Sequence, residues 1–180
     1  MSMAASPPSS EAFHGACVVM GVASCGKTTV GEAIAARLSV SFVEGDRLHA
    51  PESITKMSAG VPLTDEDRWP WLARIGDAMR GNDGIIAACS ALKKSYREAI
   101  SRAAGRPVSF VFLKGSREIL TERIKARKDH FMPPSLLDSQ LATLEEPDET
   151  EDHVAIDLAQ PLEAIVDQAV TYLLAAEKLR

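Results

Sequence analysis

Short apolar runs alternate with longer segments of helical periodicity along most of the chain. The runs are rich in Val, Ile and Phe, which is typical of strands buried on both faces of a parallel sheet. We expect strands at residues 17–21, 41–44, 84–89, 108–113 and 154–158. We expect helices at residues 27–38, 51–58, 65–80, 92–104, 117–126, 134–144 and 162–178. This alternation predicts a three-layer α/β fold with a five-stranded parallel sheet and right-handed crossovers.

The loop after the first predicted strand has the G-x-x-x-x-G-K-T pattern of a phosphate-binding loop. Its residues are Gly21, Val22, Ala23, Ser24, Cys25, Gly26, Lys27 and Thr28. The two glycines let the backbone approach an anion closely, and the loop N–H groups and the helix N-terminus converge on a β-phosphate. Lys27 is expected to reach the β- and γ-phosphates, and the Thr28 hydroxyl is placed to bind Mg²⁺. Since a strand precedes the pattern and a helix follows it, we expect nucleoside triphosphate binding.

Two residues of this region have open roles. Thr29 belongs to the nucleotide-binding segment, where it caps or packs the helix. Cys25 is either a reactive thiol, since a helix N-terminus activates thiols, or a small residue that fits the loop.

The composition limits the class of protein. With 180 residues, of which 46% are hydrophobic, we expect a single domain at residues 15–180 after a disordered tail at 1–14. The net charge of −5 gives no basic surface for nucleic acid. No apolar run approaches the ~20 residues that cross a bilayer, and no signal peptide is evident. Three cysteines without metal-ligand spacing favour a reducing cytoplasm and argue against a zinc site.

Polar residues follow the predicted strands at the sheet edge where ligands bind. Asp46, after the second strand, is our candidate to orient or deprotonate an acceptor hydroxyl in phosphoryl transfer; the alternative is a turn residue after Gly45. Glu44 or Asp46 is expected to help Thr28 hold Mg²⁺ through water. Gln160, after the fifth strand, is assigned to the nucleotide side.

Residues 48–80 insert two helices between the second and third strands, a region that generally closes over the phosphate acceptor in small P-loop kinases. Lys56 and Arg68 could pair with an anionic group of the acceptor, and Arg68 is favoured because its planar fork matches a carboxylate. Trp69 and Trp71 face different sides of a helix, so we expect one in the core and the other at the pocket.

The segment after the third strand also carries cations. Ser90 follows the strand end directly, and Lys93 and Arg97 are four residues apart, so they are predicted to share a helix face in the cleft. We expect Lys93 and Arg97 to bind the acceptor, whereas Lys94 fits a solvated face.

A basic helix end at Arg123 and Arg127, followed by His130 and several prolines, predicts a lid over about residues 123–147. Its arginines would clamp phosphates when the lid closes. The alternative is a basic helix that faces solvent.

Taken together, these stretches resemble the gluconokinase family of P-loop carbohydrate kinases. The similarity rests on residues 21–28, 44–49, 56–72, 89–97, 113–115, 125–131 and 144–147, and extends over about residues 16–175. The stretches 56–72 and 89–97 are specific to the family, whereas the phosphate loop alone is not.

The resemblance implies ATP- and Mg²⁺-dependent phosphorylation of D-gluconate at its 6-hydroxyl, a nucleoside-monophosphate-kinase-like fold with a mobile lid, and a homodimer. It implies Asp46, Lys27 and Arg127 as catalytic residues, with Arg123 and Arg127 on the phosphates. It implies that His49, Arg68, Lys93 and Arg97 hold the sugar acid, whose hydroxyl Asp46 would orient. We also assign Lys56, Trp71, Ser90 and His130 to this site.

Two other functions compete with this interpretation. The first is a different small-molecule kinase, such as a shikimate or nucleoside-monophosphate kinase. The second is a GTP-dependent switch, which is disfavoured because the chain has no Asn-Lys-x-Asp motif for guanine.

Overall fold

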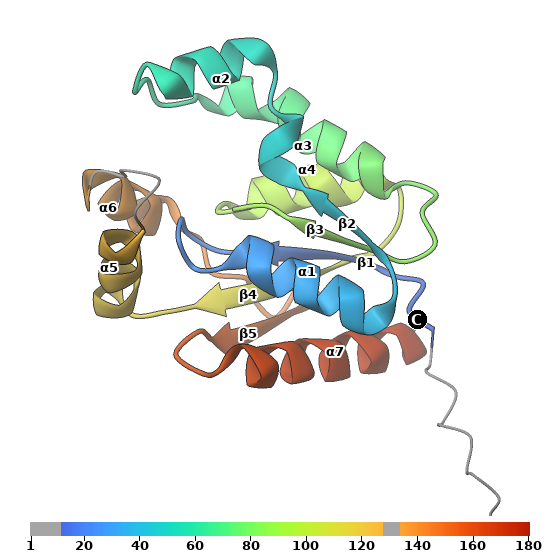
Figure 1. Ribbon diagram of the computed structural model, residues 1–180. Coiled ribbons are helices and arrows are strands. Elements are labelled where there is room, and N and C mark those ends of the chain that lie inside the picture. Colours follow the sequence, from blue (N-terminus) through green and yellow to red (C-terminus); the bar gives the residue numbers. More distant parts are fainter. Residues whose placement is uncertain (1–11, 128–133) are drawn as a thin grey trace, which may run out of the picture.

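The fold is built on a five-stranded parallel sheet in the order β2-β3-β1-β4-β5. A computed structural model describes residues 12–127 and 134–180 (Figure 1). The strands are β1 (Ala16–Met20), β2 (Ser41–Glu44), β3 (Ile85–Ala88), β4 (Val108–Lys114) and β5 (His153–Asp157). The predicted α/β fold and its parallel sheet are confirmed. Residues 1–11 of the expected tail lie outside the described residues.

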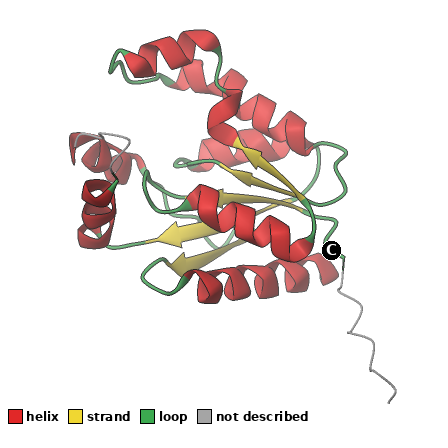
Figure 2. Cartoon of the chain, viewed as in Figure 1, coloured by secondary structure: helices red, strands yellow, loops and turns green. Residues whose placement is uncertain are grey.

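Helices cover both faces of the sheet, so the three layers are confirmed (Figure 2). The helices are α1 (Lys27–Leu38), the short 3₁₀ helix η1 (Gly45–Leu48), α2 (Pro51–Ser58), α3 (Asp65–Met79), α4 (Lys94–Ala104), α5 (Arg117–Ala126), α6 (Pro134–Thr143) and α7 (Leu162–Lys178). Among the described residues, no helix has the length and apolar character needed to cross a membrane.

The central strand β1 separates two hydrophobic clusters. Cys17 and Val19 point to the face covered by α1 and α7, while Val18 and Met20 point to the face covered by α3 and α4. Successive residues of a strand alternate between the two faces, and all four side chains are fully buried because helices cover both faces. The phosphate loop therefore begins at the end of the most deeply buried strand.

Two element boundaries differ from the prediction in ways that shape the site. β1 ends at Met20, because the backbone leaves the strand conformation at Gly21, which has a φ of 145°. Only glycine fits there, since a Cβ would lie 2.8 Å from the Cys25 sulfur. The helix expected from residue 92 begins only at Lys94, because Ala91 has a left-handed φ of 46° and Lys93 is extended. Residues 90–93 are therefore a loop between β3 and α4.

The expected acceptor segment and lid project from this core. α2 lies above the sheet edge next to α3, and α5 and α6 pack together near the end of β4 (Figure 1). A capping box between Thr64 and Asp67 begins α3, and an ion pair of 2.7 Å from Lys56 to Asp67 ties α2 to it.

Candidate active site

The phosphate loop has the backbone shape of an anion-binding loop. Gly26 adopts a left-handed φ of 92° at the start of α1, and Ser24 adopts a φ of 63°. The first turn of α1 has no acidic residue and no side-chain cap, so its N–H groups are open to an anion. The Lys27 ammonium lies within the loop, 3.0 Å from the carbonyl oxygen of Val22. The loop thus pairs a cation with free backbone donors, as a polyphosphate requires.

Oxygen ligands suited to a hard cation gather beside this loop. The Thr28 hydroxyl donates a hydrogen bond to the Glu44 carboxylate at the end of β2. Glu44 also accepts from the backbone N–H of Asp46 at 3.4 Å. Mg²⁺ is usually bound by one or two protein oxygens together with phosphates and water, and this donor set fits that pattern. In residues 12–127 and 134–180, no group of three or more His, Cys, Asp or Glu side chains could hold a metal.

Both arginines predicted for the phosphates reach the loop from α5. Arg123 donates to the carbonyl oxygens of Cys25 at 3.3 Å and of Leu158 at 2.9 Å. Arg127 Nη1 lies 3.4 Å from the Ser24 hydroxyl. The end of α5 therefore places two guanidinium groups at the mouth of the phosphate loop.

Two glutamines lie on the same side. Gln160 accepts from Gln168 at 2.6 Å and donates to Asp157 O at 3.1 Å, just past the carbonyl of Leu158 that Arg123 contacts. Gln140 on α6 accepts from the Ala23 N–H of the phosphate loop at 2.6 Å. Sequence reasoning missed Gln140, because no sequence pattern relates residues 117 positions apart.

The acceptor side begins at η1, which carries Asp46 exposed at the carboxyl end of β2. The indole N–H of Trp71 donates to Gly45 O at 2.8 Å and so fixes η1 against α3. His49 stacks on Trp71 with ring centroids 4.1 Å apart and planes at 16°. Trp71 is thus both a core residue and the wall behind His49, while Trp69 is 39% exposed and meets the Tyr96 ring edge to face, with centroids 5.6 Å apart.

The His49 ring is partly withdrawn from water. Its Nδ1 atom is buried and has no hydrogen-bond partner among the described residues. Burial lowers the pKa of His49 below 6.5, and the nearby Asp46 carboxylate opposes this effect. The imidazole therefore favours its neutral form, and one of its nitrogens is buried beside Trp71 without a hydrogen-bond partner in the described part of the chain.

Cations from two separate elements meet at one carboxylate. Lys93 Nζ lies 3.0 Å from Asp65, Arg68 Nη1 lies 3.8 Å from it, and the Tyr96 hydroxyl donates to it. The hydrogen bonds from Tyr96 and Lys93 lower the pKa of Asp65, so this group remains an anion at neutral pH. Arg68 and Lys93 are therefore already arranged around a carboxylate.

Lys56, also expected on the acceptor, is engaged elsewhere. Its ammonium pairs with Asp67, and this hydrogen bond lowers the pKa of Asp67 to about 2. Lys56 is held at the junction of α2 and α3, with its side chain still 44% exposed.

Arg97 does not lie with Lys93. Its side chain is only 1% exposed, and its guanidinium pairs with Glu151 at 2.6 and 3.0 Å and donates to Ala91 O at 2.9 Å. The expectation of a shared helix face was wrong, because Lys93 precedes α4 rather than belonging to it. The expected contact between Arg97 and an acceptor is replaced by a buried ion pair.

Two other residues were expected on the acceptor. The backbone carbonyl oxygen of Ser90 accepts a hydrogen bond from the Gly21 N–H at 3.2 Å. His130 lies outside the described residues.

Comparisons with known proteins agree with this geometry. A family model described as an AAA domain matches residues 17–147. The chain is 43% identical over 164 residues to a gluconokinase of Gluconobacter oxydans (strain 621H), covering 89% of this chain and 92% of that protein. It is 42% identical to the thermoresistant gluconokinase of Escherichia coli (strain K12), covering 87% and 92%.

A crystal structure of a gluconokinase from Sinorhizobium meliloti 1021 superimposes with a TM-score of 0.86 at 51% identity, covering 94% of this chain and 97% of that chain. The similarity thus extends over most of both chains. The chain therefore belongs to the gluconokinase family of P-loop kinases.

Proposed function

We propose that this protein transfers the γ-phosphoryl group of ATP to the 6-hydroxyl of D-gluconate, giving ADP and 6-phosphogluconate. The observation that carries the proposal is the convergence of Arg68 and Lys93 on one carboxylate, Asp65. A sugar acid presents the same group, and two cations can bind it when they are released from or shared with Asp65. The names of the relatives support the same substrate.

The phosphate loop and α5 would act on the transferred group. Lys27 and the N-terminus of α1 bind the β- and γ-phosphates, and Arg123 and Arg127 neutralise charge that spreads over the phosphoryl oxygens. We assign Gln160 to the nucleotide side. Mg²⁺, held by Thr28 with Glu44 or Asp46 through water, would supply further charge neutralisation.

Asp46 would act on the acceptor. The 6-hydroxyl oxygen attacks the γ-phosphorus, the bond from that phosphorus to the β–γ bridging oxygen breaks, and Asp46 orients the hydroxyl and accepts its proton. His49, Trp71 and Ser90 complete the sugar-acid site around it. Lys56 joins them only when its ammonium leaves Asp67 or is shared with it. We assign Arg97 to support of this site rather than to contact with the substrate, because its donors are occupied within the protein.

We further propose that residues 48–80 form the acceptor-binding segment, that about 123–147 form a lid, and that the enzyme works as a homodimer in the cytoplasm. The basic end of α5 at the mouth of the phosphate loop supports the lid. Light scattering of the purified protein tests the dimer, since a monomer mass would contradict it.

The experiment for the substrate is a coupled ADP-release assay with ATP and Mg²⁺. D-gluconate is compared with other aldonates, glucose, shikimate and nucleoside monophosphates at equal concentrations. We expect the highest kcat/KM with gluconate and little turnover of glucose, because glucose lacks the carboxylate that Arg68 and Lys93 would bind. Brisk turnover of shikimate or a nucleotide with none of gluconate would contradict the proposal.

A further inference from the structure

The loop of residues 90–93 carries two of the expected acceptor ligands, Ser90 and Lys93, and it holds an unfavourable backbone conformation. Ala91 has a φ of 46°, a left-handed value that costs a residue with a Cβ about 1 kcal/mol. Such a conformation persists only where surrounding contacts fix it. The contacts around this loop therefore decide where the Lys93 ammonium lies.

One side of the loop is joined to the phosphate loop. The backbone N–H of Gly21 donates to Ser90 O at 3.2 Å, and Cys89 N donates to Val19 O at 3.1 Å just before the loop. These bonds connect the acceptor ligands to the loop that would bind the triphosphate. They fix only the first residue of the acceptor loop.

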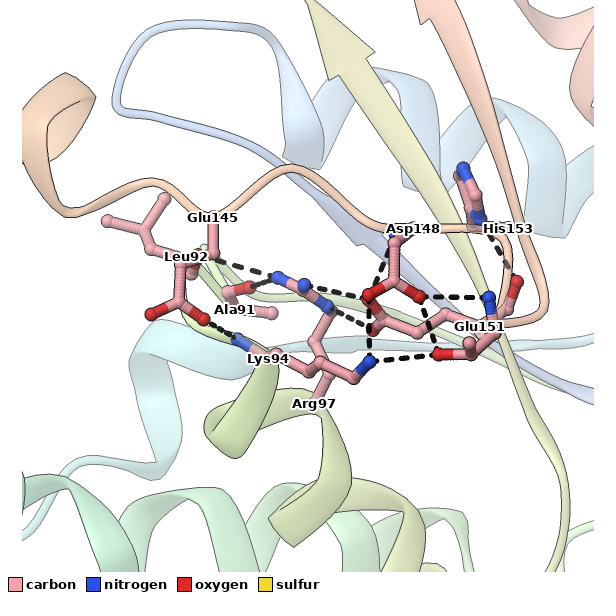
Figure 3. A network of polar contacts seen from close by, with 9 residues as sticks. Ala91, Leu92, Lys94, Arg97, Glu145, Asp148, Glu151 and His153 are labelled. Carbon is pink, nitrogen blue, oxygen red and sulfur yellow. Dashed lines mark hydrogen bonds and ion pairs between the residues drawn. The ribbon is translucent and has the colours of Figure 1, made fainter.

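The other side is held by a buried arginine. Figure 3 shows the Arg97 guanidinium between the carbonyl groups of Ala91 and Leu92 on one side and Glu151 on the other. The Glu151 side chain is only 10% exposed, and the bond of 2.6 Å that it accepts from Arg97 Nε is shorter than the bonds of 2.9 and 3.4 Å from Arg97 to the two carbonyls. Arg97 thus fixes two consecutive carbonyl groups of the loop, those of Ala91 and Leu92.

Glu145 completes the arrangement from a distant part of the chain. Its backbone N–H donates to Leu92 O at 2.8 Å, and its carboxylate accepts from the Lys94 N–H at 2.8 Å. α4 has no side-chain cap of its own, so a residue 51 positions away caps it. Leu144 beside it packs against both hydrophobic clusters, which makes the anchor rigid.

We propose that Glu145 is a positioning residue for the acceptor site: its cap on α4, together with the Arg97–Glu151 ion pair, fixes the loop of residues 90–93 so that Lys93 meets Arg68 at the substrate carboxylate. This inference rests on the proposed gluconate kinase activity. In this proposal Glu145 touches no reacting group. It acts through the backbone on both sides of Lys93, at the Leu92 carbonyl and the Lys94 N–H.

Glu145→Ala tests this inference, because Glu145 is exposed and its loss leaves no buried charge unpaired. We expect the KM for gluconate to rise about three- to ten-fold, the KM for ATP to change less than about two-fold, and Glu145→Gln to restore most of the loss because its amide oxygen still accepts. Glu146→Ala is the matched control, since Glu146 pairs with Lys114 at 2.8 Å and does not touch the loop. It is expected to leave both KM values near those of the wild type.

Hydrogen exchange gives a second measurement that does not depend on the substrate. The Lys94 amide should exchange about ten-fold faster in Glu145→Ala than in Glu146→Ala, while amides of β1 are unchanged. An equal KM for gluconate in the two variants, or equal protection of the Lys94 amide, would overturn the positioning role. If the wild type itself failed to phosphorylate gluconate, the proposed function would fail, and the exchange measurement would still decide whether Glu145 fixes the loop.

Discussion

The Thr28 hydroxyl donates a hydrogen bond to the Glu44 carboxylate, which joins the first turn of α1 to the carboxyl end of β2. Glu44 also accepts from the N–H of Asp46, so a single carboxylate links the expected metal ligand with the expected base. The Glu44 carboxylate therefore connects Thr28, on the expected nucleotide side, with Asp46, on the expected acceptor side. Removal of the Glu44 charge should affect the metal more than either substrate.

Glu44→Gln should raise the Mg²⁺ concentration needed for half-maximal activity by about ten-fold, because a neutral amide is a weaker partner for a hard cation and its water ligands. The measurement is a Mg²⁺ titration of the rate at saturating ATP and gluconate. Glu32→Gln on the exposed side of α1 is the control and should leave the titration unchanged. The same Mg²⁺ requirement in both variants would separate Glu44 from the metal.

Lys27→Ala should lower kcat/KM by about 10³-fold, since it removes the cation that stabilises the moving phosphoryl group. The Lys27 ammonium contacts the carbonyl of Val22 and the Cys25 sulfur within its own loop, so the fold should persist. Circular dichroism and the thermal unfolding midpoint check the fold, and initial rates check transfer. Turnover close to the wild type would refute the role of Lys27.

Asp46→Asn should lower kcat by about 10²-fold or more, while the KM for ATP stays nearly constant, because Asp46 is assigned to the acceptor hydroxyl. Asp83→Asn is a matched control, since Asp83 pairs with His14 at 2.6 Å on an exposed surface before the start of β3, whereas Asp46 follows the end of β2. If Asp46→Asn changed only the KM for ATP, Asp46 would belong to the nucleotide side.

The sequence alone predicted those parts of the fold that depend on local pattern. The strands and the phosphate loop were predictable because short apolar runs and the glycine spacing are local signals. Arg97 was misplaced because the start of α4 depends on a left-handed Ala91, a conformation that Ala rarely adopts. Its partner Glu151 is 54 residues away, and no periodic pattern indicates such a pairing. Side-chain contacts between distant segments, like that of Gln140 with Ala23, require the folded chain.

Arg68→Met should raise the KM for gluconate by about 10- to 100-fold, the range expected when a hydrogen bond to a charged group is lost. The apolar replacement keeps most of the side-chain packing, and the Asp65 carboxylate keeps its ion pair with Lys93. The ratio of gluconate to glucose turnover should fall with it. Arg37→Met is the control, because Arg37 pairs with Asp167 on the surface of α1 and α7. An unchanged preference for gluconate would show that Arg68 does not read the carboxylate.

His49 should make folding stability depend on pH. Burial lowers its pKa in the folded protein below the ordinary value of 6.5, with Arg74 and Arg68 acting in the same direction and Asp46 opposing them. The unfolded chain therefore binds a proton more readily than the folded chain as the pH falls through 6.5, and the folded state loses stability there. Above that pH both states are neutral at His49 and the effect vanishes.

His49→Phe isolates this effect, because a phenyl ring can keep the stack on Trp71 but cannot bind a proton. The free energy of unfolding of the wild type, measured by chemical denaturation relative to this variant, should fall between about pH 7.5 and about pH 5.5. The comparison cancels carboxylates and other histidines that titrate in both proteins. A constant difference across the two pH values would mean that the folded protein accepts a proton on His49 as easily as the unfolded chain does, which would contradict the lowered pKa.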